Sequence, residues 1–585
     1  MADEPLVLRA INWRDAFPFT HIFRSFRVAI HPSKLVLAVL AILCLYIGGR
    51  VLDQVWMRDA RGIPNEVERF HQFMLARNGD WLTGSRDAAA DLPRSPLAMD
   101  GSSFADLVRE SRSRTAEQYA SALQNLGVQS DPAKALEMAR NGEGLRDLRR
   151  KLIEQRRLRI ERAVDDYKAR VAAAEQLPAD QRAPAIKSAN DALLRDKRQA
   201  HAETLRALEQ AGQIRGKGLF DLFVDYQARR ANDIVAGIVE WNWLGGIGRD
   251  PRSPGVVVST VRFLTVAPCW ALRHHPLYFT LWGALFLVVW SVFGGAICRI
   301  CAIHVARDES LSVRLALRFS LGKFLSFLFA PIIPLLILLF IGVALALGGL
   351  LLYVPYFGEI VVGLLFFLTL CGGLVMTLVL LGTLGGLNLM YPTVAVEGSD
   401  SFDAISRSFS YLYSKPWRLA FYSGVALVYG ALTWLFVRFF IWAALAMTHY
   451  FVGWWAYRRA DNGQHVLDAL WPAPQFSSLP YSIAFPSLNW GQDLGAFFIA
   501  LWVYLAIAVL GAFAISFYFS ASTIIYYLMR KEVDATELDD VYLEQPDEEL
   551  PQTPAAPEPA APAAAAPSAP AAPPADPRPD TGSGI

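Results

Sequence analysis

Six long apolar runs constrain this sequence of 585 residues more than any other feature does. A helix needs about 20 consecutive apolar residues to cross a bilayer, and only the first run is shorter, though still able to span. Because lipid offers the backbone no hydrogen-bonding partners, such runs must form helices. The sequence therefore predicts an all-α polytopic membrane helix bundle of about six spans, near 35–49, 277–302, 326–353, 360–390, 419–441 and 494–527.

Composition supports the membrane class and excludes others. Hydrophobic residues make up 54% of the chain and charged residues only 19%, which is too apolar for an ordinary soluble protein. A formal net charge of +1 argues against nucleic acid as a partner. The five cysteines do not form the pattern of a disulfide framework.

Basic residues beside the apolar runs predict the orientation of the chain. Each basic flank lies at a span end that falls on the same side of the membrane when the chain crosses six times: Lys34, Arg299, Lys323, Arg418 and Arg530. Cytoplasmic flanks carry the excess of Lys and Arg, so both termini are expected in the cytoplasm. We interpret the first run as an uncleaved signal anchor, and the whole chain as a multi-pass protein of a bacterial inner (cytoplasmic) membrane.

A soluble insert separates the first two runs, so the chain has four predicted parts. Residues 51–276 turn to Arg, Asp, Glu, Ala and Leu, and helical spacing over 145–176 and 185–210 predicts an antiparallel coiled hairpin outside the cytoplasm. The end of the insert, 256–272, is expected to rest on the outer leaflet. The other parts are an amphipathic segment with its span at 1–50, a five-span membrane domain at 277–531, and a disordered tail at 532–585 that is first acidic and then rich in Pro and Ala.

Three amphipathic segments, which we call elbows, precede the three pairs of spans at 20–31, 308–323 and 391–418. In the third, Phe402, Ile405, Phe409 and Leu412 share one helical face, so the helix is expected to lie flat on the membrane. The elbows suggest three repeats of one elbow and two spans, although any cytoplasmic loop tends to be basic. The candidate contacts with lipid headgroups are Arg24, Arg27, Arg314, Arg318, Arg407, Lys415 and Arg418.

These cations have two possible roles. As membrane anchors each would gain roughly 1 kcal/mol from anionic headgroups. Alternatively, some arginines turn inward and hold a lipid phosphate through the bidentate geometry of guanidinium. A further arginine, Arg438, is expected to extend from the fifth span to the membrane surface.

Chemical motifs are weak throughout. Cys298 and Cys301 have the spacing of a redox or half-zinc motif, but no second pair accompanies them, so we interpret them as inert or lipid-modifiable thiols. Gly382 and Gly386 have the small-residue spacing that permits close helix packing. We predict no catalytic, metal or cofactor site.

The third elbow resembles a known family. The stretch PTVAVEG at 392–398, followed by AISRSF at 404–409, is similar to a loop in the bacterial polytopic membrane domain found fused to glycerophosphoryl diester phosphodiesterases, and in related uncharacterised membrane proteins. The resemblance covers the second through the sixth span. It implies a membrane architecture and no phosphodiesterase activity, because the hydrolase has no counterpart here, and the long insert departs from the family pattern.

Function is predicted from these features together. We expect a non-enzymatic scaffold or assembly component of the cell envelope, with membrane lipids as partners and protein partners at the insert or the tail. The alternative is a transporter or lipid-handling protein, suggested by the repeated spans and their glycines. The spans lack Asp and Glu, which disfavours a carboxylate relay for protons or sodium. An intramembrane enzyme has the least support.

Overall fold

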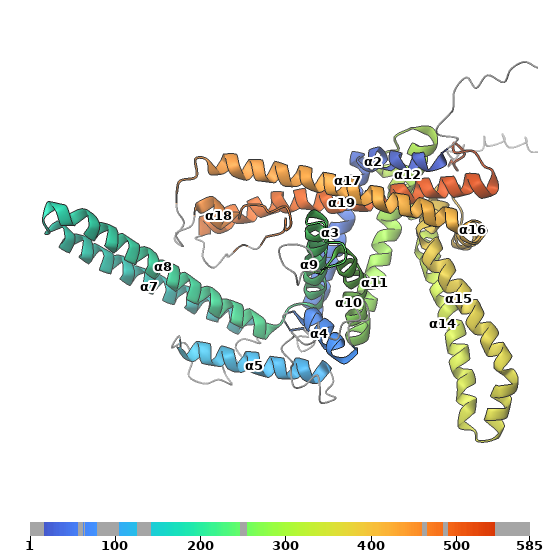
Figure 1. Cartoon of the computed structure of the whole chain (residues 1–585), viewed down its shortest axis with the longest axis horizontal. Helices are drawn as coiled ribbons and strands as arrows, with labels where there is room; N and C mark the ends of the chain where they lie inside the picture. The colour runs from blue at the N-terminus through green and yellow to red at the C-terminus, as the bar shows by residue number, and fades with distance from the viewer. Residues whose placement is uncertain are drawn as a thin grey trace, which may run out of the picture. The chain divides into compact units, whose positions relative to one another are not determined.

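The computed structural model describes residues 17–56, 62–63, 65–78, 104–125, 142–245, 254–458, 465–481, 483 and 490–543. These residues form helices and no β-sheet, which confirms the all-α prediction (Figure 1). In the described part, seven helical segments are long and apolar enough to cross a membrane: Pro32–Val55, Val256–His274, Pro276–Arg307, Phe324–Tyr353, Phe357–Glu397, Pro416–Gly453 and Trp490–Asp534.

The candidate span that the sequence did not predict is α10 (Val256–His274). Its apolar residues are interrupted by Arg262 and Pro268, and its mean hydropathy of 1.3 is the lowest among the seven segments. In the structure it is a continuous helix that packs lengthwise against α9 (Leu219–Val239). A polytopic bundle is confirmed, and α10 adds a candidate span to the six predicted.

The membrane helices follow a repeated order in which one short helix precedes two long ones. The order agrees with the predicted repeat, which stays a prediction. The first group is α2 (Arg24–Ala29), preceded by η1 (Pro18–Phe23), then α3 (Pro32–Val55) and, after the insert, the continuous α11 (Pro276–Val289), η5 (Trp290–Gly294) and α12 (Gly295–Arg307). The second is α13 (Val313–Gly322), α14 (Phe324–Gly349) with η6 (Leu350–Tyr353), and α15 (Phe357–Glu397). The third is α16 (Ser401–Ser414), α17 (Pro416–Gly453) and α19 (Trp490–Asp534), with α18 (Val466–Leu470) between the last two.

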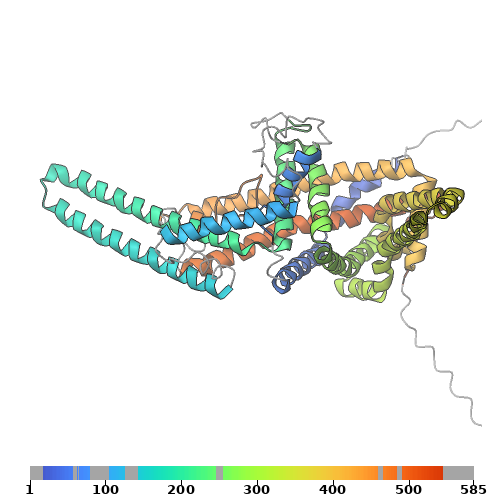
Figure 2. The same ribbon diagram turned by 90° about the horizontal axis from the view of Figure 1, so that it is seen from below.

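The insert contains the longest charged helices of the chain. These are α7 (Gly142–Glu175) and α8 (Ala179–Arg215), which lie side by side in both views (Figures 1 and 2). Their contact is a narrow seam that includes Leu152 and Ala174 on α7 and Ala189 and Ala200 on α8. The insert also holds α4 (Glu66–Asn78) and α5 (Phe104–Asn125), and α5 packs against α8.

Two buried carboxylates join the insert to the membrane helices. Asp53, near the end of α3, accepts hydrogen bonds from the backbone amide of Phe220 at 3.1 Å and from the Tyr278 hydroxyl at 2.7 Å. It thereby caps the first turn of α9, whose amides have no partner within their own helix. Glu66 accepts from the Trp270 indole at 3.2 Å.

Glu66 also carries an electrostatic signature. Burial by itself raises the pKa of this carboxyl, but its contact with His275 and the hydrogen bond from the Ile63 amide more than offset that effect. The pKa of Glu66 is therefore lowered, and the carboxylate is ionised in the folded protein at neutral pH.

By its internal contacts the chain divides into two units, Met1–Val541 and Tyr542–Ile585. The start of the predicted tail belongs to the first unit, because Glu532 and Asp534 lie in α19 and Val541 is buried. The tail boundary therefore lies about ten residues later than 532, and its Pro/Ala-rich part lies outside the described residues.

Candidate functional site at the junction of three helix ends

The core of the first unit forms where the last turns of α12, α15 and α19 pack together. Each of these is the second long helix of its group, and each buries apolar residues there against the other two. We call this region the three-helix junction. Its buried side chains include Cys298, Ile300 and Ala302 on α12, Leu389, Val394 and Val396 on α15, and Ile524, Tyr527 and Leu528 on α19.

Backbone carbonyls at the junction accept hydrogen bonds from side chains of neighbouring helices. The last carbonyls of a helix have no partner within it, and Arg299 of α12 donates to one of these, the Ala395 carbonyl of α15, at 2.8 Å. Tyr527 of α19 donates to the Ala302 carbonyl of α12, before the last turn of that helix, at 3.1 Å. The Arg299 guanidinium also lies 4.2 Å from the centroid of the Phe319 ring. These hydrogen bonds tie the three helices to one another.

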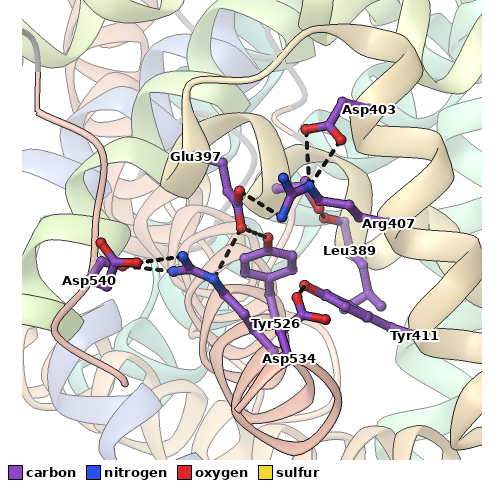
Figure 3. Close-up of polar contacts among 10 residues, drawn as sticks. Leu389, Glu397, Asp403, Arg407, Tyr411, Tyr526, Asp534 and Asp540 are labelled. Carbon is purple, nitrogen blue, oxygen red and sulfur yellow. Dashed lines mark hydrogen bonds and ion pairs between the residues drawn. The ribbon is translucent and has the colours of Figure 1, made fainter. Parts of the chain in front are cut away.

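Glu397, the last residue of α15, is the centre of the polar contacts in Figure 3. Its carboxylate accepts a hydrogen bond from the Tyr526 hydroxyl at 2.7 Å and lies 3.1 Å from Nε of Arg530, both on α19. The other carboxylate oxygen lies 2.9 Å from a guanidinium nitrogen of Arg407 on α16. Only 11% of this side chain is exposed, so one buried acid holds two cations from two helices.

Each of these arginines also has a second acid at the rim. Nε of Arg407 lies 3.0 Å from Asp403, one turn earlier on α16, and Arg530 lies 2.7 Å from Asp540. We call Glu397, Asp403, Arg407, Tyr526, Arg530 and Asp540 the Glu397 cluster. Partial burial works against the charged form of Arg407, but the hydrogen bond to Asp403 and the charge of Glu397 outweigh it, so the pKa of Arg407 is raised. The cluster sets three carboxylates against two guanidinium groups and ties α15, α16 and α19 to one another.

Local sequence explains how Glu397 and Arg407 reach one another. Gly398 ends α15 with a left-handed backbone, φ 65°, which a residue with a side chain rarely adopts. Asp400 then accepts from the amide of Asp403 at 2.9 Å and caps α16. This tight turn sends α16 back against α15.

A second acid on α19 binds the start of α17. Glu532 lies 3.2 Å from Nζ of Lys415, pairs with Arg418 and accepts from the Tyr422 hydroxyl at 3.4 Å. The ends of α16, α17 and α19 are thus joined by two acids, Glu397 and Glu532.

The structure separates the seven predicted headgroup contacts into two groups. Four take part in ion pairs within the chain: Arg407, Lys415 and Arg418 as described, and Arg24, which lies 3.9 Å from Asp308. Three have exposed side chains: Arg27, Arg314 and Arg318. A contact of any of them with lipid stays a prediction.

The apolar face of the third elbow packs on protein. Phe409 and Leu412 of α16 sit directly over Gly382 and Gly385 of α15, where an added Cβ would lie 2.7 and 2.8 Å from their side chains. The predicted glycine face therefore exists, and its partner is the elbow of the same chain. Phe402, on the same helix, remains exposed.

Sequence reasoning missed Glu397, Tyr526 and Arg530 as site residues. Glu397 lies more than a hundred positions from Tyr526 and Arg530, so no local spacing connects it to them. One signal was present: an acid at the C-terminal end of a helix is disfavoured by the helix dipole unless cations compensate for it. Glu397 is the last residue of α15, whereas the predicted span stopped at 390, so this signal was not recognised in the sequence.

The two cysteines of α12 are buried. Sγ of Cys301 lies 3.7 Å from Nζ of Lys34 and 3.2 Å from Oγ of Ser520, and neither Cys298 nor Cys301 has exposed surface. This burial is contrary to the lipid-modifiable alternative, because an acyl chain cannot reach these thiols in the folded protein.

Arg438 is covered by protein, and its extension to the membrane surface stays a prediction. Its side chain is only 4% exposed, and its guanidinium donates to the carbonyls of Phe476 at 2.9 Å and Ser477 at 3.1 Å. The aromatic loop between α17 and α19 folds over it. The sequence indicated how far along the fifth span Arg438 lies, but not that a loop covers it.

No protein-family model, curated protein or solved structure matches the chain, and the resemblance at the third elbow stays a prediction.

Proposed function

We propose that this chain is a non-enzymatic membrane scaffold, an assembly component of the cell envelope, whose insert binds a protein partner. The proposal places it in a bacterial inner membrane with both termini in the cytoplasm. The α7–α8 hairpin carries the proposal. Its helices have 34 and 37 residues, so each extends about 50 Å at 1.5 Å per residue.

The surface of the hairpin supports binding of another protein. The two helices bury few of their described side chains, chiefly leucines and alanines along their seam, so most of the others are available to a partner. Apolar residues interrupt the charged surface: Leu158 is 46% exposed and Ile186 is 36% exposed. An amphipathic or charged helix of another protein could use such residues as anchors.

The three-helix junction favours a protein whose membrane helices keep fixed positions relative to one another. A transporter moves one group of helices against another around its substrate site. Here the Glu397 cluster and the hydrogen bond from Arg299 join α12, α15, α16 and α19, and separating these helices would leave the buried Glu397 without its two cations. This favours a scaffold over the transporter alternative.

Purification of the full chain from its native membranes in mild detergent tests the proposal. Quantitative mass spectrometry should find one protein at near-equal stoichiometry. Replacing Leu158 and Ile186 with Glu should lower its recovery at least tenfold, because charged side chains cannot enter an apolar interface.

Leu244→Glu is the matched control. Leu244 is more exposed than either hairpin residue and lies outside the hairpin, after α9. Recovery of the partner should be unchanged in this variant. The scaffold proposal fails when no protein co-purifies stoichiometrically, or when the control removes the partner as effectively as the hairpin variant.

A further inference from the structure

A cavity of about 320 Å³ lies between η1 and the first turns of α17. Aromatic rings form most of its lining, and the rings of Phe19 and Phe421 meet edge to face at 5.7 Å. Trp417, Arg418 and Tyr422 complete the α17 side. The volume lies at the lower end of the range of small-ligand sites. The cavity is therefore apolar along one wall and cationic at one point.

The charge beside the cavity is positive. Arg418 and Lys415 both pair with the single acid Glu532, which leaves one positive charge in excess. The side chain of Arg418 is 53% exposed, so it can bind a second anion. The site also lies at the N-terminal end of α17, where the helix dipole adds partial positive charge.

The position on α17 indicates the kind of ligand. Pro416 begins a helix that is long and apolar enough to cross a membrane, and Trp417 is 86% exposed. Exposed tryptophan and arginine at the start of a span are typical of the headgroup layer. Arg27 and Arg314 lie on other elbows and do not line this cavity.

We propose that this cavity binds one anionic phospholipid, with its phosphate on Arg418 and Lys415 and the upper part of an acyl chain against Phe19 and Phe421. The phosphate then shares both cations with Glu532. This site is independent of the proposed scaffold function, because it lies on η1 and α17 and not on the insert.

Native mass spectrometry of the full-length protein in detergent tests the site, with dioleoyl phosphatidylglycerol as the titrant and dioleoyl phosphatidylcholine for comparison. One equivalent of the anionic lipid should bind at least tenfold more tightly than the zwitterionic one. Arg418→Ala should remove that preference, whereas Arg418→Lys should retain most of it. The matched control Arg314→Ala removes an exposed elbow arginine and should change nothing.

The Glu532→Gln variant distinguishes a lipid site from a purely structural ion pair. Removing the competing carboxylate should tighten binding of phosphatidylglycerol severalfold, whereas a purely structural pair would only lose stability, which a melting curve of each variant measures. Several results would overturn the proposal: equal losses in Arg418→Ala and Arg314→Ala, weaker binding in Glu532→Gln with an unchanged melting curve, or competition by inorganic phosphate at the same concentration as lipid. If deletion of residues 2–16 tightened the binding of phosphatidylglycerol, the occupant of the cavity in the full chain would be that segment and not a lipid.

Discussion

Neutralising Glu397 should destabilise the three-helix junction. Glu397→Gln keeps the shape of the side chain but removes the charge that Arg407 and Arg530 share, and leaves the Tyr526 hydroxyl with a neutral acceptor. Breaking a buried ion pair by removing one partner costs about 3–5 kcal/mol.

The ion pairs that the two arginines retain reduce this cost. Arg530 is only 11% exposed but retains Asp540, and Arg407 is 38% exposed and retains Asp403. Because neither cation is left alone, we expect a loss of about 2–3 kcal/mol in the free energy of unfolding. In a chain of this size that corresponds to a fall of only a few degrees in the melting temperature.

Tryptophan fluorescence during a thermal ramp of the detergent-purified protein measures the effect. Asp403→Asn is the matched control, because it removes a carboxylate from the same Arg407 at a partly exposed position, where an ion pair contributes about 0.5 kcal/mol or less. Equal shifts for Glu397→Gln and Asp403→Asn would refute the reasoning, since burial would then have no influence on the cost.

Three further outcomes follow from other parts of the chain. The pKa of Glu66 is lowered by folding, so its contribution to stability should be complete above about pH 4.3 and lost as the pH falls through its folded pKa; a Glu66→Gln variant should show a flatter acid limb in melts from pH 7 to pH 3. Gly382→Val would force an added side chain onto the Phe409 ring and should cost about 1–3 kcal/mol, with Gly363→Val, which has open space, as the control in the same melting assay. A cysteine placed at Ala179 should react with a membrane-impermeant reagent in intact cells while one at Ala556 should not; the reverse pattern would invert the predicted orientation.

The membrane class and the helical order could be predicted from sequence because they depend on local properties. Runs of apolar residues report burial in lipid, and the period of Leu and Ala between 145 and 210 reports a helix. α10 was missed as a candidate span because Arg262 and Pro268 reduce the same local signal.

The site could be predicted only in part, because its contacts join distant parts of the chain. Basic residues of the elbows are visible in the sequence, but whether Arg407 meets lipid or Glu397 depends on how α16 folds back on α15. That fold depends on Gly398, whose left-handed backbone no periodic pattern reveals. Arg438 illustrates the same limit, since a loop 38 residues away covers it.

A disulfide tests directly whether α12 packs against α19 at the three-helix junction. Sγ of Cys301 and Oγ of Ser520 lie 3.2 Å apart, so Ser520→Cys brings two sulfur atoms within bonding reach once the side chains rotate. The other four cysteines are replaced by alanine, and a protease site is placed between α17 and α19.

After mild oxidation and cleavage, the two fragments should run as one band on a non-reducing gel and separate on reduction. Ser522→Cys is the control, because Ser522 is also buried but lies on a different face of α19. The predicted result is a cross-link in Ser520→Cys alone; no cross-link there, or equal cross-linking at Ser522, would contradict the junction.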